Sequence, residues 1–227
     1  MTYRSIGITL AIIVAYVAFS FIGARTAVGA GAGVPAPTAD DALAAKSDPQ
    51  TVVLAGGCFW GVQLVFEHVK GVSSAIDGYS GGGLKNPSYE DVSSGTTGHA
   101  ESVKVTYDPA QITFGHLLQI YFSVVTDPTE LNYQGPDEGT QYRGAIFYTT
   151  PDQQRIANAY IAQLDDAHVF KHKIVTEVTP FDAFYQAEAY HQDYAERNPY
   201  SPYIAMYDAP KLRNLKSTFP DFYVAKR

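Results

Sequence analysis

Apolar residues recur along the chain with two periods, and these periods predict where its helices and strands lie. The β-branched run at 51–55 ends at two glycines and is typical of a buried strand. From Phe59 to Val69 apolar residues recur every three or four positions, which predicts a helix, and Gly71 suits the position after its end. Cys58 is therefore expected where a strand gives way to a helix.

The same patterns continue through the rest of the chain. Strands are predicted at 72–79, 101–107, 142–149 and 173–178, and helices at 113–125, from Pro151 onward and at 183–196. Thr113 and Thr150 are the expected helix caps. Because strands and helices alternate, we predict an α/β (α+β) fold, a two-layer sandwich with a mixed sheet and a ferredoxin-like core.

The first 30 residues are predicted to be a targeting segment. An uncharged apolar stretch at 6–22 lies between Arg4 and Arg25, with a length between that of a signal peptide and that of a membrane span. The small residues at 28–30 favour cleavage by signal peptidase, and a retained N-terminal anchor is the alternative. A buried core helix is a third interpretation, but the stretch has no amphipathic pattern. Either targeting interpretation predicts an extracytoplasmic domain, periplasmic, secreted or membrane-anchored.

Residues 31–50 are rich in Ala, Gly, Pro and Asp and lack large apolar side chains. Such a segment buries too little apolar surface to offset the entropy of ordering, so we predict a flexible linker. One folded domain is then expected over 51–215, followed by a C-terminal tail at 216–227. A domain of this size suits one core and a monomer.

Composition limits the partners and cofactors. The chain has a net charge of −7 and no run of Lys or Arg, which argues against nucleic acid as a partner because phosphate binding needs basic patches. Its single cysteine cannot form an intrachain disulfide, and no Cys/His spacing fits a zinc site. We expect neither a metal nor another cofactor.

The single cysteine, Cys58, lies in the stretch GGCFWG at 56–61. A lone cysteine is often a small buried apolar residue without chemistry. At a helix N-terminus, however, free N–H groups and the helix dipole lower the pKa of a thiol toward the thiolate. The flanking glycines are expected to leave open space for a substrate. Cys58 is therefore a candidate nucleophile.

Glu101 is the candidate acid. In the alternating stretch at 101–107 it shares a face with Val103, Val105 and Tyr107, which is expected to turn inward. A buried carboxyl group tends to stay protonated, because desolvation disfavours its anion. The alternative is that Glu101 lies in water at a frayed strand start.

Several motifs together resemble one enzyme family. Besides GCFWG at 57–61, the chain contains NPSY at 86–89, GHAES at 98–102, GPDEGTQYRG at 135–144 and YHQDY at 190–194. In this order they resemble the motifs of the A-type peptide methionine sulfoxide reductases, over about residues 51–215. The resemblance implies Cys58 as nucleophile and Glu101 as acid. It further implies that Tyr89 and Tyr142 contact the sulfoxide oxygen, that Phe59 and Trp60 bind the methyl group, and that Asp137 and His191 line the pocket.

The resemblance implies thiol-dependent reduction of methionine S-sulfoxide, in proteins or free, through a Cys58 sulfenic acid. Many members of the family carry further cysteines near the C-terminus, whereas the stretch at 197–215 has none. Recycling of Cys58 is therefore expected to need an external thiol, from a thioredoxin-like protein or a small molecule.

Two other functions remain open from the residues alone. Cys58 and His191 could form a Cys–His pair for acyl transfer, as in amidases. The domain could also bind methionine-containing partners without catalysis, in which case the thiol would be dispensable.

Overall fold

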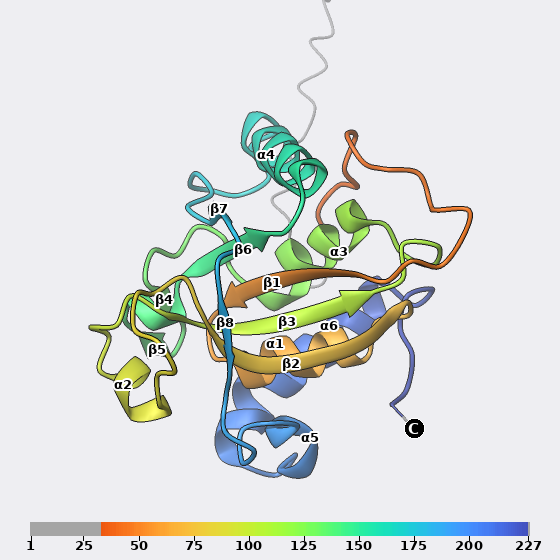
Figure 1. Cartoon of the computed structure of the whole chain (residues 1–227). Helices are drawn as coiled ribbons and strands as arrows, with labels where there is room; N and C mark the ends of the chain where they lie inside the picture. The colour runs from red at the N-terminus through yellow and green to blue at the C-terminus, as the bar shows by residue number, and fades with distance from the viewer. Residues whose placement is uncertain (1–32, 227) are drawn as a thin grey trace, which may run out of the picture.

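The computed structural model describes residues 33–226, and a six-stranded mixed sheet forms its centre (Figure 1). The strands stand in the order β7-β6-β1-β3-β2-β8, and every neighbouring pair is antiparallel except β6 and β7. A small hairpin of β4 and β5 lies apart from this sheet. The bounds are β1 Gln50–Gly56, β2 Val72–Ser80, β3 Ala100–Tyr107, β4 Tyr133–Gln134, β5 Asp137–Glu138, β6 Gly144–Tyr148, β7 Glu177–Pro180 and β8 Phe184–Gln186.

The helices connect these strands in the order of a ferredoxin-like core. Helix α1 carries the chain from β1 to β2 across β3, and α3 leads from β3 toward β6, which gives the split β-α-β arrangement that was predicted. Two helices include a π-helical segment, after α3 and before α6. The bounds are α1 Phe59–Glu67, α2 Tyr89–Ser93, α3 Phe114–Ile120 with Tyr121–Val125, α4 Pro151–Asp166, α5 Tyr194–Arg197, and Ile204–Asp208 with α6 Ala209–Thr218.

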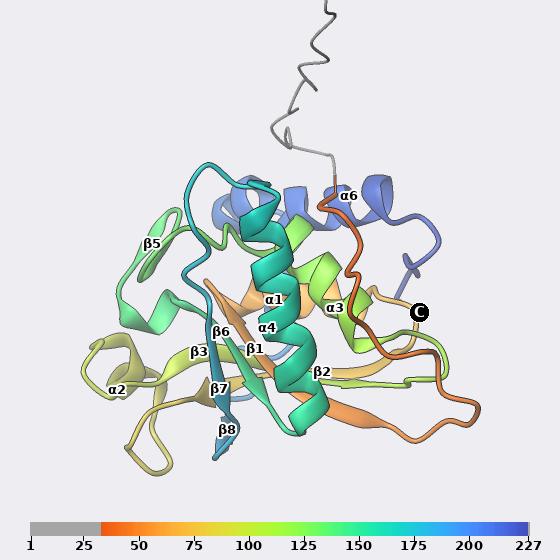
Figure 2. The same cartoon turned by 90° about the horizontal axis from the view of Figure 1, so that it is seen from above.

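The main core lies between one face of the sheet and the helices. Alternate side chains of β1 point to opposite faces of the sheet. Val52 and Leu54 belong to the core that α1, α3 and α4 cover. Helix α4 lies beside β6 and β7 (Figure 2). Val53 and Ala55 face the other way, into a small cluster with Phe147. The two-layer architecture is therefore confirmed.

The segment before β1 is packed onto the domain, so the predicted flexible linker is wrong from Gly33 onward. Val34 is buried, and the Tyr160 hydroxyl donates to the Pro35 carbonyl at 2.5 Å. The Asp40 carboxylate accepts from the Gly115 N–H at 2.9 Å at the start of α3. Helix-end capping and backbone hydrogen bonds supply the stabilisation that the composition did not indicate.

Three predicted elements differ from the structure. The helix expected at 183–196 is wrong, because Phe184 pairs with Ser80 of β2 and only the short α5 is helical there. The strand expected at 173–178 begins at Glu177, where pairing with Ala145 of β6 starts. The strand expected at 142–149 begins at Gly144, because residues Thr140–Tyr142 form a 3-10 turn.

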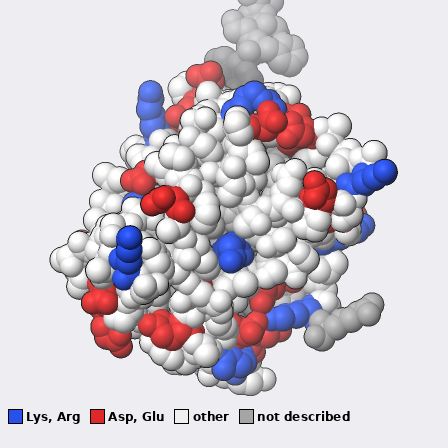
Figure 3. Space-filling model, viewed as in Figure 1, with Lys and Arg blue, Asp and Glu red and all other residues white. Residues whose placement is uncertain are grey.

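The residues after α6 also pack onto the domain. Tyr223 forms a bridge with Val69, and Lys226 pairs with Glu67 and Asp193 at 2.8 and 2.6 Å. On the face seen in Figure 3, acidic and basic side chains are interspersed. Within residues 33–226 no helix has the length and apolar character needed to cross a membrane. The predicted signal or anchor at 1–30 lies outside the described residues.

Candidate active site

Cys58 lies in the tight connection between β1 and α1. It is the residue before the first turn of α1, and its side chain is 8% exposed. Gly57 has φ +91°, in the region that favours glycine, and a Cβ there would lie 2.7 Å from Cβ of Gln134. Gly61 likewise packs against the Asp208 carboxylate. The expectation of open space beside the glycines is therefore wrong, because neighbouring side chains fill it.

Glu101 lies at the start of β3, beside the first turn of α1. Its Oε2 accepts from the Phe59 N–H at 3.1 Å, and its side chain is 3% exposed. Burial raises the pKa of Glu101 to about 8, so at neutral pH the carboxyl group is mainly protonated. The prediction that Glu101 turns inward is confirmed, its raised pKa agrees with the expected protonation, and the alternative of a carboxylate in water at a strand end is wrong.

The pKa of the Cys58 thiol is raised, which corrects the expected shift toward thiolate. Desolvation is the largest cause, and the nearby carboxyl groups of Glu101 and Asp208 add to it. The Trp60 N–H does stabilise the thiolate, as expected at a helix N-terminus, but this effect is smaller than burial. The resting site therefore holds a neutral thiol beside a neutral acid.

Asp208 is a buried carboxylate behind the first turn of α1. It has no exposed surface, and its Oδ1 lies 3.6 Å from Nζ of Lys211, one helical turn along. Burial raises its pKa to about 6, which leaves it mostly ionised at neutral pH. A fixed negative charge therefore opposes ionisation of Cys58.

Aromatic rings form the wall beside the thiol. Phe59 is buried, and its ring centroid lies 5.0 Å from that of His191. Trp60 stacks on Tyr194 at 3.9 Å between ring centroids, and Tyr203 meets it edge-on at 6.0 Å. Such a wall suits an apolar group that carries a partial positive charge.

His191 orients this wall. Its Nδ1 accepts from Trp60 Nε1 at 3.1 Å, while its Nε2 is buried and has no hydrogen-bond partner among the described residues. Burial lowers the pKa of His191, so the ring is neutral. Because Trp60 occupies one ring nitrogen and Cys58 bonds to neither, the geometry does not favour the Cys–His pair.

Three phenols surround the acid and the thiol. Burial raises the pKa of Tyr89, Tyr142 and Tyr203, and the charges of Glu101 or Cys58 raise each further, so all three remain donors. The Tyr203 hydroxyl donates to the Asp137 carboxylate. The eight residues singled out in the sequence therefore gather around one site.

Sequence reasoning missed several residues of the site. Glu188 accepts from the Tyr79 hydroxyl at 2.8 Å and from the Tyr89 N–H at 2.9 Å, and thereby fixes α2 beside the thiol. The tyrosine-rich stretch at 197–215 supplies two more residues of the site, Tyr203 and Asp208. Its aromatic content was the available signal. Within the described residues, no group of three or more acidic, His or Cys side chains could hold a metal.

Comparisons with known proteins agree with this geometry. The sequence profile "Peptide methionine sulfoxide reductase" matches residues 50–222. Peptide methionine sulfoxide reductase MsrA 2 of Mesorhizobium japonicum is 55% identical over 177 residues, which are 78% of this chain and 91% of that protein. The protein of the same name from Synechocystis sp. is 52% identical over 172 residues, which are 76% of this chain and 80% of that protein.

Solved structures give the same assignment. Methionine sulfoxide reductase A of Corynebacterium diphtheriae matches with a TM-score of 0.58 and 32% identity, over 78% of this chain and 92% of that chain. Reduced Mxr1 of Saccharomyces cerevisiae matches with a TM-score of 0.60 and 31% identity, over 72% of this chain and 92% of that chain. The chain belongs to the peptide methionine sulfoxide reductase family.

Proposed function

We propose that this reductase acts on the S epimer of methionine sulfoxide, with Cys58 as nucleophile and Glu101 as general acid. The family gives the reaction, a thiol-dependent reduction of methionine sulfoxide to methionine. One observation carries the assignment of roles: a buried carboxyl group with a pKa of about 8 lies beside the only thiol of the chain. The preference for the S epimer rests on the family resemblance.

In the first step Glu101 transfers its proton to the sulfoxide oxygen. The resulting sulfur centre is cationic, and in this buried site its charge favours the Cys58 thiolate. The thiol proton then passes to the Glu101 carboxylate, which restores the acid. This order of events fits a resting Cys58 whose pKa is raised.

In the second step Cys58 Sγ attacks the cationic sulfur, and the S–O bond of the substrate breaks. The released hydroxide then attacks Sγ, and the new Sγ–S bond breaks with its electron pair going to the substrate sulfur, so that Cys58 is left as a sulfenic acid and the substrate leaves as methionine. The substrate sulfur gains two electrons, and Cys58 loses them. Tyr89 and Tyr142 donate to the sulfoxide oxygen, and Phe59 and Trp60 hold its methyl group.

An external thiol completes the cycle, because the chain has no second cysteine. The thiol attacks the sulfenic acid, water leaves, and a second thiol reduces the mixed disulfide. A thioredoxin-like protein or a small thiol supplies these groups. The predicted segment at 1–30 supports an extracytoplasmic location, as a secreted or membrane-anchored monomer.

A single-turnover experiment tests the proposal. Protein given methionine S-sulfoxide without reductant should form one methionine per chain and gain the mass of one oxygen, and a sulfenic-acid probe should label Cys58. Cys58→Ser should give no methionine while its thermal unfolding stays close to that of the parent. Repeated turnover without added thiol would overturn the recycling step. Turnover of Cys58→Ser within tenfold of the parent would overturn the nucleophile.

A further inference from the structure

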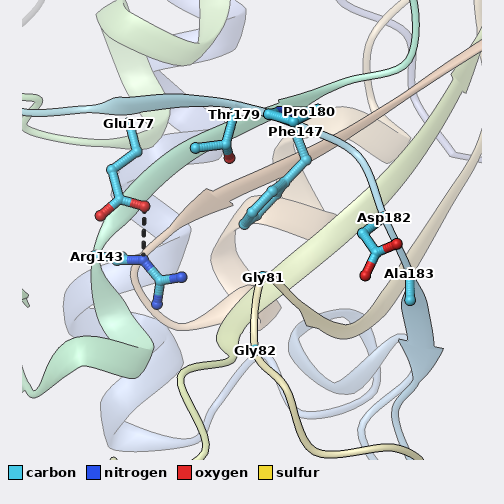
Figure 4. A pocket seen from close by; sticks show the side chains of 9 residues that line it. All are labelled: Gly81, Gly82, Arg143, Phe147, Glu177, Thr179, Pro180, Asp182 and Ala183. Carbon is cyan, nitrogen blue, oxygen red and sulfur yellow. Dashed lines mark hydrogen bonds and ion pairs between the residues drawn. The ribbon is translucent and has the colours of Figure 1, made fainter.

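A surface groove lies at the Cys58 end of the sheet, on the face away from the main core (Figure 4). Its first part, the Phe147 hollow, has a volume of about 250 Å³, and its lining includes Gly81, Arg143, Phe147, Glu177, Thr179 and Asp182. Its second part, the Thr140 hollow, has a volume of about 410 Å³ and shares Arg143 and Glu177 with the first. The two hollows therefore adjoin at the Arg143–Glu177 ion pair, which lines both.

The register of the strands places this groove next to the site. Tyr79 pairs with Glu101, and Gly81 follows two residues later, roughly 7 Å along the chain. Arg143 directly follows Tyr142. A peptide that passes over the end of the sheet can therefore place one residue at Cys58 and a near neighbour in the groove.

The Phe147 hollow carries an uncompensated negative charge. The charge of Arg143 is already paired: its guanidinium donates to Glu177 at 3.1 Å and to the carbonyls of Thr140 and Gly98 at 2.9 and 3.1 Å. The Asp182 side chain is exposed, and no cation among residues 33–226 pairs with it. The nearby Lys104 lies over the Phe184 ring and does not line the hollow.

The other walls suit an apolar stem with a polar backbone. In Figure 4 the Phe147 ring lies between Arg143 and Asp182 and forms the floor. The Thr179 hydroxyl is buried and has no hydrogen-bond partner within the described residues, so it is available to form a hydrogen bond with a bound peptide. A long aliphatic side chain with a cationic head matches this floor and this charge.

We propose that the Phe147 hollow binds a Lys or Arg side chain close in sequence to the methionine sulfoxide of a peptide or protein substrate. The proposal rests on the proposed function and adds a substrate preference to it. Asp182 binds the cationic head, and Phe147 contacts the stem. Free methionine sulfoxide does not reach the groove.

Peptides of seven residues with a central methionine S-sulfoxide test the proposal. Lys, Ala or Glu is placed in turn at each of the three positions on either side, and kcat/KM is measured at low and high salt, with N-acetyl methionine sulfoxide as the small substrate. The enzymes are the parent, Asp182→Asn, Asp182→Lys and the control Asp166→Asn, which removes an exposed carboxylate at the end of α4.

We expect the parent to prefer Lys over Glu by roughly three- to tenfold at one or two positions, less at high salt. Asp182→Asn should remove most of this preference and Asp182→Lys reverse it, while Asp166→Asn keeps it. All four enzymes should reduce the small substrate equally. Equal rates for all peptides, or a preference that survives in Asp182→Asn, would overturn the subsite. Loss of activity on the small substrate in the parent would instead contradict the proposed function.

Discussion

At the scale of single residues, the proposed role of Glu101 as general acid ties the activity to its protonation. Its pKa of about 8 predicts that kcat/KM of the parent falls as pH rises through about 8, because only the protonated acid can donate a proton to the sulfoxide oxygen. Glu101→Gln should lower the rate by roughly 10–10³-fold and abolish this fall. Steady-state kinetics between pH 6 and 10 measure both effects.

Glu67→Gln is the matched control. Glu67 also has a raised pKa, of about 7, but it lies at the far end of α1, paired with Lys226. Its replacement should leave the rate and the pH profile unchanged. A profile of Glu101→Gln that coincides with that of the parent would show that Glu101 is not the acid.

The same carboxyl group links stability to pH. Because its pKa is higher in the folded state than the ordinary value of 4.5, the unfolded chain loses this proton first as pH rises. The contribution of Glu101 is therefore fully present below about pH 4.5 and decreases up to about pH 8. Urea unfolding should show a smaller loss of stability over this range in Glu101→Gln than in the parent.

Asp208 should control the reactivity of the thiol. Its buried charge raises the pKa of Cys58, so Asp208→Asn should lower that pKa and speed alkylation by iodoacetamide at neutral pH. The pH dependence of alkylation measures the shift, and Asp166→Asn serves as the charge-matched control. An unchanged midpoint in Asp208→Asn would show that the charge of Asp208 does not contribute to the raised pKa of Cys58.

At the scale of elements, the turn from β1 to α1 depends on glycine. Gly57→Ala brings a Cβ to 2.7 Å from Gln134 at φ +91°, and both features destabilise the fold, together by roughly 2–4 kcal/mol. Gly83→Ala is the control, because a Cβ at that glycine meets nothing within 4 Å. Urea midpoints of the two variants should differ clearly. Equal stability would mean that the Gln134 side chain moves aside without lowering the free energy of unfolding.

At the scale of the whole molecule, the segment before β1 should stabilise the domain. A chain that begins at Gln50 loses the buried Val34 and the Asp40 hydrogen bonds at the start of α3. We therefore expect its free energy of unfolding to be roughly 2–5 kcal/mol lower than that of a chain that begins at Gly33. Urea unfolding of both chains provides the measurement. Activity at low temperature should persist in both. Equal stability would restore the interpretation as a linker.

The local patterns predicted most of the scaffold because they report which residues must be buried. The alternation at 101–107 placed Glu101 correctly on the core side of β3, and the caps Thr113 and Thr150 accept from His116 and Gln153 as expected. The helix expected at 183–196 was wrong, since its apolar spacing is also compatible with β8 pairing to β2 and a turn. Such pairing depends on a strand about 100 residues away, which local spacing does not contain.

The sequence by itself determined the family and most of the central strands and helices, and it singled out the candidate reacting residues. Those follow from the motifs and the hydrophobic periods, which are local properties. Only the tertiary structure decided the protonation of Cys58, the filling of the space beside Gly57 and Gly61, and the packing of the segment from Gly33. Each of these depends on side chains distant in sequence, Asp208, Gln134 and Ser123 among them. A pKa reflects the total burial and charge around a group, and therefore only the folded chain sets it.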